Sequence, residues 1–333
     1  MPSSTASAVA IVTGAAIAYY LLRRSRRATH AWVAELQRQG KLGALHAETR
    51  LAVDLALQCG AAMLATAGAQ VSWKDDGGID PVTATDQANE DLVTRSLARA
   101  FPAHRVIGEE AVAAGGSVPL ITPTDGPTWY VDPIDGTQNF VHAMPLSCVS
   151  IGLAVGGVPV LGVIYHPQQD ELFVGLTAAA ATPPLGPEAH GSYLNGRRLR
   201  ADTQATTLGS SMVLTDVGYE RSEAGVRRIG AVLSRLLSLN VRAIRMIGSS
   251  ALCVAWVAAG RASAFYAGLH KRDTPKQWDW CAGHAIATAA GVYFVRLGDE
   301  RPFDIDGSAA ICAGTPQLAA ELKREVEAAL AAA

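Results

Sequence analysis

The chain has 333 residues, with 28 Lys and Arg against 30 Asp and Glu, which gives a formal net charge of −2. At about 150 residues per domain, this length holds two domains or one large one. The near-neutral charge excludes a basic nucleic-acid binder and an acidic disordered chain. The five cysteines are widely spaced and form no Cys-x-x-Cys pair. We therefore expect reduced, buried thiols rather than disulfides or a thiolate zinc site.

The N-terminal segment, residues 1–30, contains an uncharged run at residues 8–22 that a cluster of arginines follows directly. A helix of this length covers about 22 Å, less than the ~30 Å hydrocarbon core. The basic flank behind the apolar run favours a membrane anchor with the rest of the chain in the cytosol, and it fits a cleaved secretory signal poorly. The absence of acidic residues before Glu35 leaves an organellar transit peptide as the alternative. A plain N-terminal helix is the third interpretation.

Apolar residues at helical spacing predict two helices early in the chain, over residues 46–67 and 86–101. The polar, glycine-containing stretch between them, residues 73–81, indicates a loop or a hairpin. Further helical patterns occupy the second half of the chain, over residues 224–237, 249–260, 282–290 and 317–332.

Between these helical regions, the spacing of the apolar residues changes to the pattern typical of strands. Residues 147–153 and 158–165 flank Gly156-Gly157, which is a two-residue hairpin signal, and a second turn leads into residues 171–175. Such an antiparallel meander argues against a purely parallel, doubly wound sheet. Residues 178–187 are rich in Ala, Pro and Gly, which indicates an exposed insertion. The sequence therefore predicts helices and antiparallel strands packed in layers.

The densest chemical signal is WYVDPIDGT at residues 129–137, where an apolar strand ends in two carboxylates, Asp132 and Asp135. Gly136 and Thr137 then begin the next element, where free backbone N–H groups can bind an anion. Two hard carboxylates beside such amides suit Mg²⁺ that bridges a phosphate. Taken alone, Asp-Pro and Asp-Gly are equally typical of turns.

Other acidic residues also stand at the ends of predicted elements. Glu109-Glu110 follow the apolar pair Val106-Ile107, Asp86 precedes a helical stripe, and Asp279 precedes an Ala/Gly-rich helix. Each has a simpler explanation by itself, a solvated loop for the glutamates and a helix N-cap for the aspartates. Because only 17% of the residues are charged, acidic groups at so many element ends indicate one shared site.

With these motifs the chain resembles the inositol monophosphatase family, within the lithium-sensitive, Mg²⁺-dependent phosphatase superfamily. The matching segments are DPVTATD (80–86), IGEE (107–110), WYVDPIDGTQNFVH (129–142), the meander at 145–175, YLNGRRLR (193–200) and WDWCAGHAI (278–286). The resemblance implies one catalytic domain over residues 46–330 behind the segment of residues 1–30. It also implies an α+β fold with a layered αβαβα sandwich and mixed or antiparallel sheets, and a homodimer.

The resemblance further implies a site for two to three Mg²⁺ ions. Glu109, Asp132 and the carbonyl group of Ile134 would hold the first ion. Asp132, Asp135 and Asp279 would hold the second.

The resemblance also implies the roles of the residues around the phosphate. The substrate would lie on the amides of Gly136 and Thr137, beside Asp135 and Asp279. Asp86 and Thr137 would orient an attacking water whose pKa the metal lowers, and Asp86 with Glu109 would lie near a third, weaker ion. Asp86, Thr137 and Glu109 are thus the predicted catalytic residues. Lys74 would stand near the metals, unless it is a surface lysine.

Two departures from the family pattern lie on the leaving-group side. Ala267 stands where the family's inositol phosphatases usually carry a glutamate that binds substrate hydroxyls. The segment at residues 271–277, KRDTPKQ, is longer than the usual link and rich in positive charge. It is either a surface insertion or a basic lip of the substrate pocket.

We therefore expect Mg²⁺-dependent hydrolysis of a small phosphomonoester, with inositol monophosphate as the first choice. The alternatives are a 3′(2′),5′-bisphosphate nucleotidase, which the basic segment at residues 271–277 would favour, and a histidinol-phosphate phosphatase. An inactive regulatory relative would need a broken carboxylate set. Nucleic acid is not expected as a partner, because no basic patch with interleaved aromatic residues occurs outside the N-terminal arginines. Membrane association is expected through residues 8–22.

Overall fold

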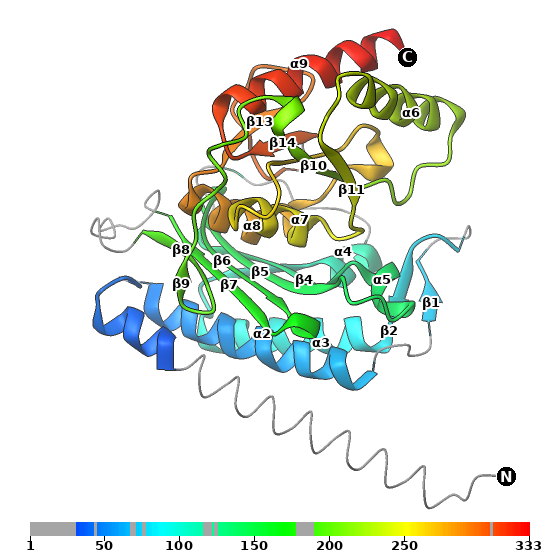
Figure 1. The fold of residues 1–333 in the computed structure, drawn as a ribbon. Coiled ribbons are helices and arrows are strands. Elements are labelled where there is room, and N and C mark those ends of the chain that lie inside the picture. The colour runs from blue at the N-terminus through cyan, green and yellow to red at the C-terminus, as the bar shows by residue number, and fades with distance from the viewer. Residues whose placement is uncertain are drawn as a thin grey trace, which may run out of the picture.

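The computed structural model describes residues 31–42, 45–66, 71–74, 78–115, 122, 126–177, 190–306 and 309–333. In this part of the chain, helices and sheets alternate in an αβαβα sandwich (Figure 1). The α+β fold expected from the sequence is thereby confirmed. Residues 8–22 and 178–187 lie outside the described residues, and so do the predictions made for them.

The larger sheet contains seven strands in the order β3-β4-β5-β6-β7-β8-β9. Their bounds are Arg105–Gly108, Thr128–Asp135, Cys148–Val155, Val158–His166, Glu171–Leu176, Gly191–Leu194 and Arg197–Arg198. Only the β3–β4 pair is parallel; every other neighbour in this sheet is antiparallel. The predicted meander is thus confirmed, with Gly156-Gly157 in the β5–β6 turn at positive φ.

Two helices cover one face of this sheet, α2 (His46–Thr66) and α3 (Ala84–Ala100) (Figure 1). Both match the helices predicted from apolar spacing. The stretch between them forms the antiparallel pair β1 (Val71–Trp73) and β2 (Pro81–Thr83), so the hairpin alternative is the correct one.

The smaller sheet contains five strands in the order β11-β10-β12-β14-β13. In chain order, β10 to β14 are Met212–Thr215, Ala243–Met246, Ala264–Ala267, Tyr293–Arg296 and Ala310–Ala313. Strand β10 is parallel to both β11 and β12, and β14 is antiparallel to its two neighbours. Helices α6 (Glu223–Ser238) and α9 (Pro316–Ala332) lie on the outer face (Figure 1).

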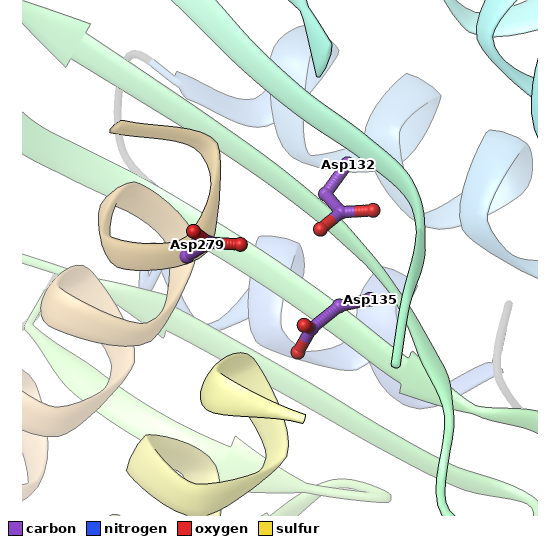
Figure 2. A group of neighbouring side chains, drawn as sticks. All are labelled: Asp132, Asp135 and Asp279. Carbon is purple, nitrogen blue, oxygen red and sulfur yellow. The ribbon is translucent and has the colours of Figure 1, made fainter. Parts of the chain in front are cut away.

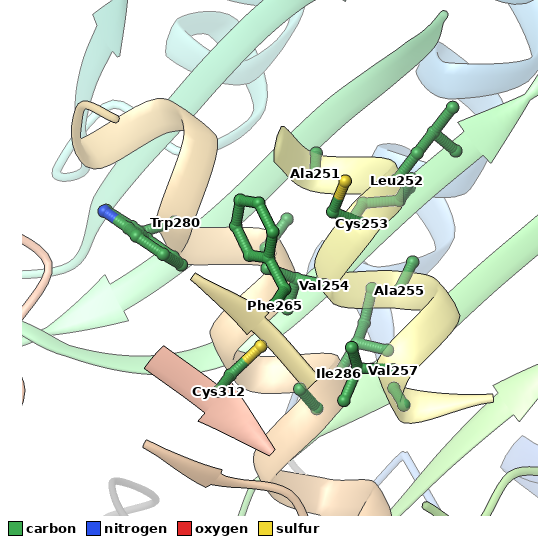
Figure 3. Packing of buried hydrophobic residues seen from close by; sticks show 14 of the residues in the cluster. Ala251, Leu252, Cys253, Val254, Ala255, Val257, Phe265, Trp280, Ile286 and Cys312 are labelled. Carbon is green, nitrogen blue, oxygen red and sulfur yellow. The ribbon is translucent and has the colours of Figure 1, made fainter. Parts of the chain in front are cut away.

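Helices α7 (Ser250–Ala258) and α8 (Gln277–Ala290) form the layer between the two sheets (Figure 1). Alanine, valine and leucine occupy most of α7, so it is buried all round. Figure 3 shows Phe265 of β12 between α7 and Trp280 of α8. The centroids of the Phe265 and Trp280 rings are 6.0 Å apart. This central packing joins the two sheets into one body.

Three local predictions need correction or completion. Helix α8 begins at Gln277, so Asp279 lies inside its first turn and not before the helix. A short helix, α4 (Glu109–Gly115), replaces the solvated loop considered for the two glutamates, and α5 (Thr137–Val141) follows β4.

All five cysteines are free and buried, as expected. Among the described helices, none combines the length and apolar character that crossing a membrane requires.

A row of glycines brings α8 close to the larger sheet. Gly152 pairs with Gly162, which in turn pairs with Gly175 on the next strand. A Cβ atom at Gly162 would lie 2.1 Å from the carbonyl oxygen of Ala282, and one at Gly175 would lie 2.3 Å from the Cα of Ile286. Both of those atoms belong to the backbone of α8, so the missing side chains set the distance between helix and sheet.

We expect Gly162→Ala to lower the free energy of unfolding by about 1–3 kcal/mol, because the added methyl group overpacks the interface with α8. The matched control is Gly230→Ala in α6, where a Cβ atom meets nothing within 4 Å. This control should stabilise the protein by about 0.5–1 kcal/mol, since alanine is the better helix former. Urea unfolding of both variants measures the difference, and equal stabilities would contradict the close packing of α8.

Candidate metal and phosphate site

Strand β4 carries two of the predicted carboxylates at its buried carboxyl end. In a regular strand, residues three apart point to opposite faces. The pairing of β4 with β5 is irregular between Asp132 and Asp135, where Pro133 offers no N–H to the ladder. Both carboxylates can therefore reach one cluster, and they are only 2% and 7% exposed.

Asp279 joins this cluster from the first turn of α8. Figure 2 shows its carboxylate facing those of Asp132 and Asp135, although the helix and the strand are far apart in sequence. One oxygen atom from each of the three residues lies within 4.8 Å of the others. The backbone N–H of Lys276 donates to Oδ2 of Asp279 at 2.5 Å, which fixes the side chain at the helix start.

The cluster is electrostatically unfavourable by itself. Burial, and then the charges of Glu109, Asp135 and Asp279, hold the pKa of Asp132 well above its usual range. Burial and the charges of Asp135 and Glu109 do the same to the pKa of Asp279. Carboxylates this close stay ionised together only if a cation neutralises them. Hard oxygen donors of this kind fit a divalent cation such as Mg²⁺.

The start of helix α7 holds the carboxylate of Asp135 in place. Oδ2 of Asp135 accepts hydrogen bonds from Ser249 Oγ at 2.6 Å and from the backbone N–H of Ala251 at 2.7 Å. Burial raises the pKa of Asp135 to about 6, while the bond from Ser249 acts in the opposite direction. Ser249 is also the N-cap of α7, and sequence reasoning missed its second role. The only available signal was a serine directly before a helical run.

Lys74 lies at the site and not on the surface. Its Nζ forms ion pairs with Glu109 at 2.7 Å and with Glu110 at 2.8 Å. Burial acts against the charged form of Lys74, but the two glutamates raise its pKa above the usual value. Burial and the charge of Glu109 raise the pKa of Glu110 to about 7. Lys74 thus compensates part of the negative charge and places Glu109 beside the cluster.

Asp86 is not the N-cap of its helix, which corrects the simpler interpretation given above. Thr83 is the N-cap of α3, and Asp86 is its partner in a capping box, where Oδ2 accepts the Thr83 N–H at 2.8 Å. The other oxygen, Oδ1, lies 3.4 Å from the hydroxyl of Thr137. Burial raises the pKa of Asp86 to about 6, against the hydrogen bonds from Thr83. The structure therefore brings Asp86 and Thr137 together, as predicted.

The turn from β4 into α5 depends on Gly136. Its φ is +88°, and a Cβ atom there would lie 2.9 Å from the carbonyl oxygens of Gly248 and Leu146. Glycine is therefore required on both conformational and steric grounds. The hydroxyl of Thr137 donates to the carbonyl oxygen of Ile134 at 2.9 Å, so the carbonyl group predicted as a metal ligand lies inside the same turn.

A cavity of about 400 Å³ is lined by Lys74, Glu109, Asp132, Ile134, Asp135, Gly136, Thr137 and Asp279. Its wall also contains Asp216, Gly218 and Tyr219 after β10, and Arg272, Asp273, Thr274, Pro275 and Lys276 of the basic segment at residues 271–277. Oδ1 of Asp273 accepts the backbone N–H groups of Tyr219 and Glu220 at 2.7 and 3.0 Å, which ties the two stretches together. The basic segment is therefore part of the pocket and not a plain surface insertion. Ala267 is buried in β12 and is not among the lining residues.

Sequence reasoning missed Asp216 and Tyr219 as members of the site. Burial and the charge of Asp135 raise the pKa of Asp216 to about 7, and burial raises the pKa of Tyr219 above its usual value. Neither residue stands in a recognisable motif. The one usable signal was the position of Asp216 directly after a short apolar strand.

We expect the stability of the metal-free protein to fall as the pH rises. The folded-state pKa values of Asp132, Asp135 and Asp279 lie above the ordinary 3.8, so their protonated forms favour the fold. This contribution is present below about pH 4 and is lost as the pH rises through about 6, where Asp135 ionises. Mg²⁺ should raise the melting temperature more at about pH 8 than at about pH 5, because protons compete with the ion.

Differential scanning calorimetry with and without chelator measures this effect, with K⁺ at matched ionic strength as the control. A stabilisation by Mg²⁺ that is equal at both pH values would show that these carboxylates do not bind the ion.

Comparison with known proteins finds relatives of one family. The profile of the inositol monophosphatase family matches residues 45–331. The chain is 43% identical to inositol monophosphatase 1 of Solanum lycopersicum over 73% of this chain and 81% of that protein. It is 37% identical to human inositol monophosphatase 2 over 80% of this chain and 86% of that protein.

A solved structure gives the same result for the fold. The inositol monophosphatase from Anabaena (Nostoc) sp. PCC 7120 superposes with a TM-score of 0.66 at 28% identity, and the match covers 85% of this chain and 95% of that one. The match to the family spans the acidic cluster, the β5–β6 hairpin and both sheets. The chain belongs to the inositol monophosphatase family.

Proposed function

We propose that this chain is a Mg²⁺-dependent phosphatase that hydrolyses a small phosphomonoester, foremost inositol monophosphate, to the free alcohol and phosphate. The observation that carries the proposal is the convergence of Asp132, Asp135 and Asp279 in a buried cluster beside the Gly136 turn. Membership of the inositol monophosphatase family supports the choice of substrate.

The residues that would hold the ions form two sets of oxygen donors. Asp132, Asp135 and Asp279 form one donor set, and Glu109 with the Ile134 carbonyl group completes a second set that shares Asp132. When bound, Mg²⁺ neutralises phosphate charge and lowers the pKa of water. The ion pair with Lys74 holds the Glu109 carboxylate in position for this role.

Thr137 and Asp86 would orient the attacking water. The Thr137 hydroxyl has one proton, which it can donate to the Ile134 carbonyl oxygen at 2.9 Å or to Asp86 at 3.4 Å. Its lone pairs then remain free to accept a hydrogen bond from water in the cavity. Asp86 is ionised above its raised pKa of about 6, so it can accept a proton or a hydrogen bond near neutral pH. The Gly136 and Thr137 amides would bind the phosphate.

We expect Asp132→Asn to reduce kcat/KM for inositol 1-phosphate by at least about a hundredfold, because the change removes a charge shared by both donor sets. The free energy of unfolding of the metal-free protein should not fall, since the charge of Asp132 is unfavourable in the fold. The matched control is Asp91→Asn on the exposed side of α3, where the carboxylate is 66% exposed. Phosphate release measures turnover, and full activity of Asp132→Asn would refute the assignment.

A bisphosphate nucleotidase is the second candidate, and the presence of Arg272 and Lys276 in the cavity wall favours it. If Arg272 binds a second phosphate, Arg272→Glu should lower kcat/KM for adenosine 3′,5′-bisphosphate by about tenfold or more, since hydrogen bonds between charged groups are strong. Turnover of inositol 1-phosphate should then change less than about twofold. Equal, small effects on both substrates would remove this candidate.

A further inference from the structure

The cavity wall contains a carboxylate that the proposed mechanism does not use, that of Asp216. Strands β10 and β12 are parallel, with Thr215 beside Tyr266. The next residues along the two strands, Asp216 and Ala267, therefore stand side by side at the carboxyl ends, where open sheets bind ligands. Ala267 offers only a methyl group and is 1% exposed, whereas Asp216 lines the cavity.

Asp216 has unused capacity to accept hydrogen bonds. Its Oδ1 accepts the backbone N–H of Val217 at 3.0 Å. Within the described part of the chain, its Oδ2 accepts no hydrogen bond and no cationic side chain pairs with it. A carboxylate offers about four lone-pair sites, so the partly exposed Asp216 can accept further hydrogen bonds from a ligand in the cavity. At Asp273, Oδ2 is buried and has no hydrogen-bond partner.

Both donors and acceptors line this wall. Asp216 and Asp273 are acceptors, Arg272 and Lys276 are cationic donors, and Tyr219 carries a hydroxyl that can do both. A second phosphate would be attracted by the two cations and repelled by the two carboxylates, and the reverse holds for an ammonium group. Alcohol hydroxyls fit both kinds of neighbour, because each hydroxyl donates one hydrogen bond and accepts others.

We infer that Asp216 determines specificity by accepting hydrogen bonds from hydroxyl groups on the alcohol portion of the substrate. The preferred ester is thus the monophosphate of a polyhydroxylated alcohol and neither a bisphosphate nor an amino-alcohol phosphate. This inference rests on the proposed phosphatase function. It adds Asp216, which directly follows β10, to the determinants of substrate choice.

The test compares two esters that share a six-membered ring and an alkyl leaving group, inositol 1-phosphate and cyclohexyl phosphate. Only the first has additional hydroxyls. We expect Asp216→Ala to lower kcat/KM for inositol 1-phosphate by about tenfold or more, mainly through KM, because a hydrogen bond to a charged group is lost. Cyclohexyl phosphate should change less than about twofold, because it makes no such bond.

Asp216→Asn serves as a second variant, because it keeps the shape and one acceptor oxygen and should show a smaller loss with the same selectivity. Asp91→Asn is the matched control for removal of an aspartate outside the cavity. The Mg²⁺ concentration for half-maximal activity should be unchanged in both Asp216 variants, which separates substrate binding from a metal effect. Thermal unfolding of each variant verifies that it is folded.

The two esters distinguish a failure of the proposed phosphatase function from a failure of the role of Asp216. If the unaltered protein hydrolyses neither ester with Mg²⁺, the proposed function fails and the role of Asp216 fails with it. If the unaltered protein is active but both Asp216 variants affect the two esters equally, or affect neither, the phosphatase stands and the inference is wrong. A selective loss of adenosine 3′,5′-bisphosphate turnover in Asp216→Ala would also overturn it.

Discussion

The close packing of α8 on the larger sheet is the constraint on which the site depends. Gly152, Gly162 and Gly175 form a paired row without side chains, so the helix backbone approaches the strands directly. The hydroxyl of Ser150, which pairs with Asp132, donates to the carbonyl oxygen of Trp278 at 3.1 Å. The helix start is thereby fixed over the end of β4, and Asp279 completes the cluster. A wider separation would leave two carboxylates where the site needs three.

This arrangement concentrates negative charge where the fold can least stabilise it. Asp132 and Asp135 are almost fully buried, and the ion pairs of Lys74 are with Glu109 and Glu110, not with the aspartates. The hydrogen bonds from Ser249 and Ala251 stabilise one oxygen of Asp135 but leave the net charge of the cluster unchanged. The protein therefore gives up some stability at this point, which is typical of sites that bind cations or catalyse reactions.

Much of this organisation could be predicted from the sequence, because it is encoded locally. The two helices over residues 46–67 and 86–101, the β5–β6 hairpin and the neighbouring strands β4 and β7 follow from apolar spacing and turn residues. The acidic residues were identified by motif, and the structure places them in one region. The error at Asp86 arose because Thr83, three residues earlier, is the actual N-cap. The homodimer and the membrane role of residues 8–22 stay predictions.

The sequence by itself determined the elements, the family and the chemical type of the site, because short-range periodicity and contiguous motifs carry that information. Only the tertiary structure decided which residues complete the pocket. Asp135 is held by Ser249 from 114 positions away, and Asp216 lies beside Ala267 through the register of two strands. Asp273 fastens the basic segment to the loop after β10 by hydrogen bonds over more than 50 positions. Such neighbours arise from packing between whole layers, and no local pattern in the chain records that packing.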